Sequence, residues 1–145
     1  MTEYQERELV WQKIAGSEKL HEIYHYYPTL HDARVVKVDC NFDKREVDVT
    51  FYYSDMVGED ANTIASTLIT LCWQNLIEAD FSCDDNDMYH MELKFVDDNF
   101  EAVLSGSYFE GRLLSKNIKV SEVIIEPEVS EETIKTFRII KFLMK

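Results

Sequence analysis

The most specific chemical pattern in the chain is a group of histidines and a glutamate near residue 20. His21, Glu22 and His25 match the HExxH motif, in which two histidines on one helix face bind zinc and the glutamate acts as general base. His31 follows His25 by six residues, which is the spacing of the third ligand in the longer metzincin pattern. A zinc-dependent hydrolase is therefore one hypothesis for this chain.

Three features of the surrounding sequence argue against a zinc site. The metzincin pattern has glycine where this chain has Pro28, and proline cannot adopt the positive φ of that turn. Only 20 residues precede His21, fewer than the sheet beside such an active-site helix needs. Met56, Met88 and Met91 lie in predicted loops or strands and not in a recognisable Met-turn. We therefore predict solvent-facing or helix-end histidines, with no metal and no cofactor.

Other catalytic patterns are weaker still. The run Asp84-Asp85-Asn86-Asp87 is rich in carboxylates, but it lacks the alternating ligands, central glycine and closing glutamate of a calcium loop. A solvated turn is the favoured interpretation. The sequence contains no P-loop, nucleophile elbow or dinucleotide-binding glycine pattern. We predict that the protein is not an enzyme.

The elements that must position these residues follow from hydrophobic periodicity. Residues 3–15 have apolar residues at helical spacing and are followed by Gly16, and a second short helix is expected from Ser17 to Tyr27, ended by Pro28. Beyond residue 34 the period becomes alternating, which is typical of strands with one buried face. The expected strands lie at 36–42, 47–53, 63–73, 77–83, 88–96, 99–105 and 117–125. The expected turns lie at 43–44, 84–87, 97–99 and near Gly106 or Gly111.

The C-terminal residues return to helical spacing. Residues 130–133 (SEET) place acidic groups where a helix N-terminus favours them. The apolar positions that follow at helical spacing are Ile134, Phe137, Ile140 and either Leu143 or Met144. We predict a single domain over residues 1–145 with an α+β fold, a meandering antiparallel sheet of six or seven strands with an N-terminal and a C-terminal helix. The pattern leaves open which face of the sheet the helices cover.

Composition limits the kinds of partner. The formal net charge is −13, which disfavours nucleic acid and anionic membrane surfaces, because both are bound through clustered lysine and arginine. A hydrophobic content of 46% indicates a folded domain and not an acidic disordered tail. The three cysteines (Cys40, Cys72 and Cys83) form no CxxC pair and read as buried thiols of a cytoplasmic protein.

One segment carries a family resemblance. Residues 26–36 (YYPTLHDARVV) resemble the aromatic-Pro-x-hydrophobic-His-Asp-Ala signature of the immunity protein 50 family of bacterial polymorphic-toxin systems. Residues 47–51 and 73–77 are similar to later elements of that family, so the resemblance covers about residues 26–125. It implies a small cytoplasmic protein that binds and neutralises a cognate toxin. For His31 and Asp32 we favour a structural role, in which the pair fixes the corner between helix and first strand.

The charge is concentrated where a basic toxin could bind. Residues 78–101 hold nine acidic residues and one basic residue, a local net charge of −8. Acidic inhibitors gain association rate and orientation from such complementary fields. The predicted contact residues are Asp80, Asp84, Asp85, Asp87 and Tyr89. The alternatives are an acidic face that serves solubility alone and an interaction module with no toxin partner. The oligomeric state is left open.

Overall fold

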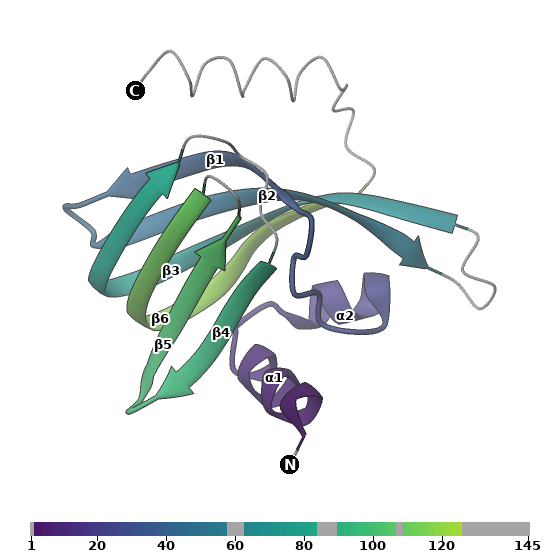
Figure 1. The fold of residues 1–145 in the computed structure, drawn as a ribbon, viewed down its shortest axis with the longest axis horizontal. Coiled ribbons are helices and arrows are strands. Elements are labelled where there is room, and N and C mark those ends of the chain that lie inside the picture. Colours follow the sequence, from purple (N-terminus) through teal and green to yellow (C-terminus); the bar gives the residue numbers. More distant parts are fainter. Residues whose placement is uncertain (1, 58–62, 84–89, 107–108, 126–145) are drawn as a thin grey trace.

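The computed structural model describes residues 2–57, 63–83, 90–106 and 109–125. These residues form two short helices followed by a six-stranded antiparallel sheet (Figure 1). The helices are α1 (Glu3–Gln12) and α2 (Glu18–Tyr24), and the strands are β1 (Arg34–Asn41), β2 (Glu46–Val57), β3 (Thr63–Cys83), β4 (His90–Val96), β5 (Asn99–Ser105) and β6 (Phe109–Ile125). The predicted C-terminal helix at 130–145 lies outside the described residues.

The sheet consists of two three-stranded meanders joined along their longest strands. The strand order is β1-β2-β3-β6-β5-β4, so β3 pairs with β6 and not with β4, its successor in the sequence. The predicted meander is therefore correct within each half and wrong between the halves. Strand pairing of β3 with β6 runs from Thr67↔Ile125 to Cys83↔Phe109, and this long ladder places β4 at the far edge.

Strands β2, β3 and β6 are clearly longer than the sequence pattern indicates, and β2 runs over Glu46–Val57 where residues 47–53 are expected. The predicted strands 63–73 and 77–83 are one strand, β3, because Asn75 takes a positive φ of 53° and the register shifts between Leu76 and Glu78 without ending the ladder. Likewise β6 begins at Phe109, so the turn considered at Gly111 is wrong. An irregularity that only shifts the register looks like a strand end in a sequence.

Gly111 stands inside β6 because a neighbouring ring occupies the space of a side chain. A Cβ atom at Gly111 would lie 2.7 Å from the Phe81 ring on the adjacent strand. Phe81 and Gly111 are directly opposite in the ladder. The glycine thus leaves room for the Phe81 ring at the position that a side chain would otherwise occupy.

We expect Gly111→Ala to lower the free energy of unfolding by about 1–3 kcal/mol, because overpacking of this kind forces side chains or backbone to move. Urea unfolding of the variant measures the loss. In the double variant Gly111→Ala/Phe81→Ala the clash is absent, so the two costs should fall short of additivity. Strictly additive costs would show that the ring contact is not the reason for the glycine.

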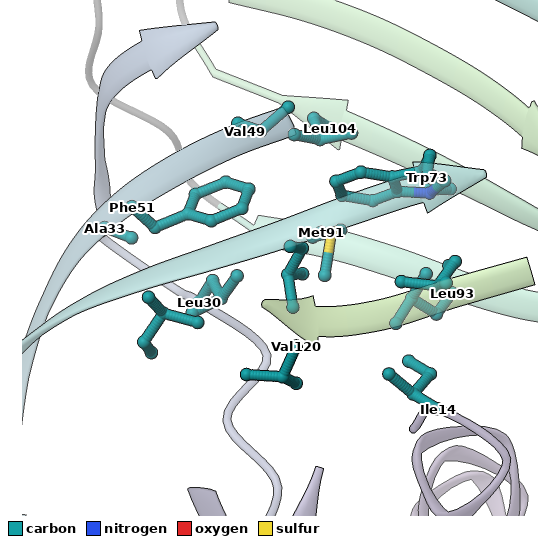
Figure 2. Packing of buried hydrophobic residues seen from close by; sticks show 14 of the residues in the cluster. Ile14, Leu30, Ala33, Val49, Phe51, Trp73, Met91, Leu93, Leu104 and Val120 are labelled. Atoms are coloured by element: carbon teal, nitrogen blue, oxygen red, sulfur yellow. The ribbon is translucent and has the colours of Figure 1, made fainter. Parts of the chain in front are cut away.

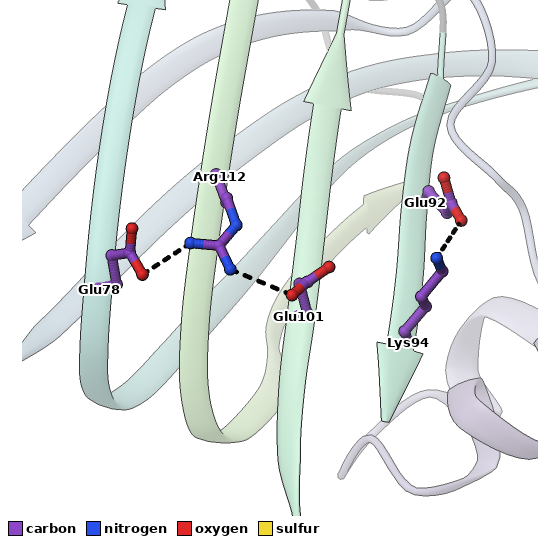
Figure 3. A network of polar contacts seen from close by, with 5 residues as sticks. All are labelled: Glu78, Glu92, Lys94, Glu101 and Arg112. Atoms are coloured by element: carbon purple, nitrogen blue, oxygen red, sulfur yellow. Dashed lines mark hydrogen bonds and ion pairs between the residues drawn. The ribbon is translucent and has the colours of Figure 1, made fainter. Parts of the chain in front are cut away.

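The sheet is bent so that its two halves share one core. In Figure 3, β3 and β6 both curve sharply just below Glu78 and Arg112, near the register shift in β3. Residues of both halves, such as Val49 on β2 and Leu104 on β5, belong to one buried cluster with Trp73 (Figure 2). We call this the core side of the sheet and the opposite side the open side.

Both helices pack on the core side. Trp11 and Ile14 enter the core from α1 and the residues after it, and Leu20 and Tyr24 enter from α2. The first helix starts with a capping box, in which the backbone N–H of Gln5 donates to Thr2 Oγ1 and the backbone N–H of Thr2 donates to Gln5 Oε1. Among the described residues, the open side consists of the strand side chains that alternate with those of the core side.

Candidate functional site

The HExxH histidines do not share one helix face. Helix α2 ends at Tyr24, and His25 takes a left-handed conformation with φ 63°, which turns its side chain away from the helical position. The second helix is therefore shorter than the predicted Ser17–Tyr27. His21 packs against the ring of Tyr27, with a centroid distance of 5.0 Å. Among the described residues, no group of three or more His, Cys, Asp or Glu side chains could hold a metal ion.

His31 and Asp32 lie on the surface of the corner that leads into β1. His31 Nδ1 is 2.9 Å from Asp32 Oδ2, and both side chains are well exposed, at 65% and 75%. The corner itself is closed by backbone, because the N–H of Ala33 donates to the C=O of Leu30 at 3.1 Å. Leu30 and Asp32 both take a positive φ there. The structural role of the His31–Asp32 pair stays a prediction.

The cysteines divide between the two environments. Cys72 is buried, as predicted, and burial together with the nearby Asp48 carboxylate raises its thiol pKa to about 12. Cys40 is exposed near the end of the edge strand β1, so its predicted burial is wrong. Cys83 is also predicted to be buried, but its side chain lies outside the part of the structure that is described.

The open side of β3, β6, β5 and β4 carries a dense set of charged side chains in cross-strand rows. One row places Asp80 beside Arg112, then Val103, then Glu92. The next row places Glu78, Leu114, Glu101 and Lys94 side by side. A third row runs through Ser82, Glu110, Ser105 and His90. We call these three rows the acidic face.

Arg112 links two carboxylates across three strands (Figure 3). Its guanidinium nitrogens lie 2.6 Å from Glu78 Oε2 and 3.2 Å from Glu101 Oε2. Its pKa is raised above the usual value, first by the hydrogen bond to Glu78. Lys94 pairs with Glu92 at 3.1 Å, and the hydrogen bond to Glu92 raises its pKa as well. Both cations of the acidic face are therefore held by carboxylates of the same face.

The acidic face keeps a net negative charge. Its five carboxylates (Glu78, Asp80, Glu92, Glu101 and Glu110) outnumber its two cations, which leaves a formal charge of −3. Asp80 and Glu110 have no ion pair within the described residues. Both are exposed, so a partner can approach them directly.

Sequence reasoning found this face only in part. Asp80 lies in it as an exposed carboxylate, whereas Asp84, Asp85, Asp87 and Tyr89 lie outside the described residues. The sequence does not predict Glu110 and Arg112 as part of this face, because one of the two glycines considered for a turn, Gly111, lies between them and their pairing with β3 joins residues about 30 positions apart. The sequence carries only a weak signal for them, because Phe109 and Leu113 alternate with Glu110 and Arg112 but Leu114 and Ser115 break the alternation.

A groove of about 800 Å³ adjoins the acidic face between α1 and the edge strand β4. Its walls include Glu6 and Arg7 from α1 and Glu92 and Lys94 from β4. Lys13 crosses it, with Nζ 4.8 Å from the centre of the Phe95 ring. Both walls carry acidic and basic side chains, so the described residues that line the groove do not form a site of one charge.

A tyrosine cluster lies on the core side between α2 and β2. Tyr24 Oη is 2.8 Å from Thr67 Oγ1, and the hydroxyls of Tyr26 and Tyr53 are 2.9 Å apart. The Tyr26 hydroxyl also donates to the Asp55 carboxylate. Burial raises the pKa of Tyr26, and the hydrogen bond to Asp55 raises it further. Burial also raises the pKa of Tyr53, to about 12.

This cluster should make stability fall at high pH. Because a free tyrosine has a pKa near 10, neutral Tyr53 contributes its full stabilisation below about pH 10 and loses it as the pH rises towards about 12. We expect the free energy of unfolding to lose about 2 kcal/mol from this residue over that window. Urea unfolding at pH 9 and pH 11.5 measures the change. An equal fall in the free energy of unfolding of Tyr53→Phe over the same pH range would show that other titrating groups cause it.

Comparison with known proteins gives no family assignment: no family model, curated protein or solved structure matches the chain. No helix among the described residues is long and apolar enough to cross a membrane.

Proposed function

We propose that this protein is a non-enzymatic immunity protein that binds and neutralises a cognate bacterial toxin through its acidic face. The observation that carries the proposal is the arrangement of five carboxylates in three adjacent cross-strand rows, with both neighbouring cations already paired. The similarity of residues 26–36 to the immunity protein 50 signature supports the toxin as the partner.

The physical case rests on charge, rigidity and apolar contact. A surface of one sign steers an oppositely charged partner and fixes its orientation, so the expected partner is a basic protein. The carboxylates stand on hydrogen-bonded strands and not on loops, so little backbone conformational entropy is lost when a partner binds. Val103 and Leu114 are half-buried between the charged side chains and offer apolar contacts.

Co-expression with the protein encoded beside this chain's gene tests the proposal. If that neighbour is a toxin, the full chain should restore growth, and the two proteins should co-purify as a complex that weakens as salt is raised. A neighbour that is toxic but is neither bound nor neutralised would contradict the proposal.

A second measurement tests the zinc hypothesis on the same purified protein. The proposal expects metal content well below one zinc per chain, because the left-handed His25 separates the motif's side chains. Stoichiometric zinc that is lost in His25→Ala would favour the hydrolase instead.

A further inference from the structure

A second surface on the open side is apolar. Across β2, β3 and β6, Tyr52 lies beside Leu68 and Leu68 beside Ile124, and Met56 lies beside Ile64 further along β2 and β3. Met56, Ile64 and Ile124 are 58%, 60% and 41% exposed, and the other two are half-buried. We call these five residues the apolar stripe.

The apolar stripe is out of keeping with the rest of the open side. Single exposed apolar residues are common on proteins, but five of them in two cross-strand rows, with only the Ser54–Ser66 pair between the rows, are typical of a contact surface. The row between its two apolar rows is polar, because Ser54 is bonded to Ser66, and the row beyond Tyr52 and Leu68 is polar as well, because Thr50 is bonded to Thr70. The stripe is therefore bordered by polar side chains on β2 and β3 and contains one polar pair.

The described chain ends at this stripe. Strand β6 stops at Ile125, one residue after Ile124, and 20 further residues follow in the sequence. Of these, residues 130–145 have apolar side chains at helical spacing: Ile134, Phe137, Ile140 and Leu143 or Met144. Such a segment has one apolar face that needs a surface to cover it.

The distances suit an intramolecular contact. Residues 126–129 can span at most about 13 Å, and neighbouring strands lie about 4.8 Å apart, so a helix that begins at residue 130 can start above β3 or β2. A helix of 16 residues is about 24 Å long, which is more than the width of the three strands. Residues 130–145 also carry four basic and two acidic side chains, which suits a chain with a net charge of −13.

We propose that residues 130–145 dock as an amphipathic helix across the apolar stripe, with the apolar face of the segment against Ile64 and Leu68. This contact covers the open side over β2, β3 and the end of β6. The acidic face lies on the other half of the bent sheet, so the docked helix leaves Asp80 and Glu110 uncovered. The inference goes beyond the proposed function and does not depend on a toxin.

Hydrogen exchange of the full chain, read at peptide level by mass spectrometry, tests the proposal. Amides of residues 134–144 should exchange at least tenfold more slowly than in an unstructured peptide. Ile64→Asp and Phe137→Asp should each abolish most of that protection. Phe42→Asp is the matched control, because Phe42 is 80% exposed in the β1–β2 turn and should leave the protection unchanged.

Each outcome decides the question. The amides of β3 and β6 report in the same spectra whether each variant is folded, so lost protection in residues 134–144 alone supports docking. Unprotected residues 134–144 in the unmodified protein would overturn the proposal. So would protection that survives Ile64→Asp, or protection that appears only as a dimer forms with rising concentration, since the occupant would then be a second copy.

Discussion

Replacing Trp73 by alanine is expected to lower the free energy of unfolding by about 3–5 kcal/mol, as large-to-small changes of buried aromatic residues do. Trp73 is fully buried on β3, with Val47 beside it on β2 and Ile118 beside it on β6. It lies in the cluster shared by the two halves of the sheet (Figure 2). The cavity would therefore open where the halves meet, and equilibrium urea unfolding measures the cost.

Trp73→Phe is the matched control for that variant. The indole N–H of Trp73 is buried and makes no hydrogen bond within the described part of the chain. An unsatisfied buried donor is itself costly, so phenylalanine, which lacks the donor, should recover most of the loss. We expect Trp73→Phe to cost less than about 2 kcal/mol. Equal costs for the two variants would show that the indole makes an interaction that ring volume does not explain.

The strands could be predicted from the sequence where one face is buried and the other is polar. Val47, Val49 and Phe51 alternate with polar residues, and the structure buries all three. The N-terminal helix and the turn at Asp97 and Asp98 were predicted for equally local reasons. Local periodicity therefore accounts for most of the elements, because it depends only on which side of each element meets water.

The pairing of distant strands could not be predicted. Asn75 interrupts the alternation of side chains in β3 but not its pairing with β6, so the sequence pattern predicts two strands where there is one. Gly111 looks like a turn residue until the ring of Phe81 is known to lie over it. The left-handed backbone conformation of His25 is part of the C-terminal end of α2, and the HExxH spacing does not predict it. In each case a tertiary contact or a single backbone angle overrides the local pattern.

The same limit applied to the candidate site. The sequence shows that acidic charge is dense within residues 78–101, and in the structure Glu78, Asp80, Glu92 and Glu101 lie on one side of the sheet. The sequence alone could not show that β6 inserts between β3 and β5. That insertion brings Arg112 between Glu78 and Glu101 and adds Glu110 beside Ser82. The acidic face is thus a product of topology as much as of composition.

Reversing the charge of Asp80 and Glu110 together should test that face most directly. Both side chains are exposed and lack an ion pair within the described residues, so Asp80→Lys/Glu110→Lys breaks no internal bridge seen there. The formal charge of the face changes from −3 to +1. We expect affinity for the basic partner to fall about 10-fold to 100-fold, mainly through slower association, because exposed charges act chiefly on the encounter rate.

Surface plasmon resonance at two salt concentrations measures this effect, with Glu22→Lys/Asp43→Lys as the control. Glu22 on α2 and Asp43 in the β1–β2 turn are also exposed, so the control makes the same change in net charge away from the face. If location matters, only the first variant loses most of its affinity and most of the salt dependence of its association rate. If both variants lose affinity equally, the partner responds to net charge alone and the acidic face is not the binding site.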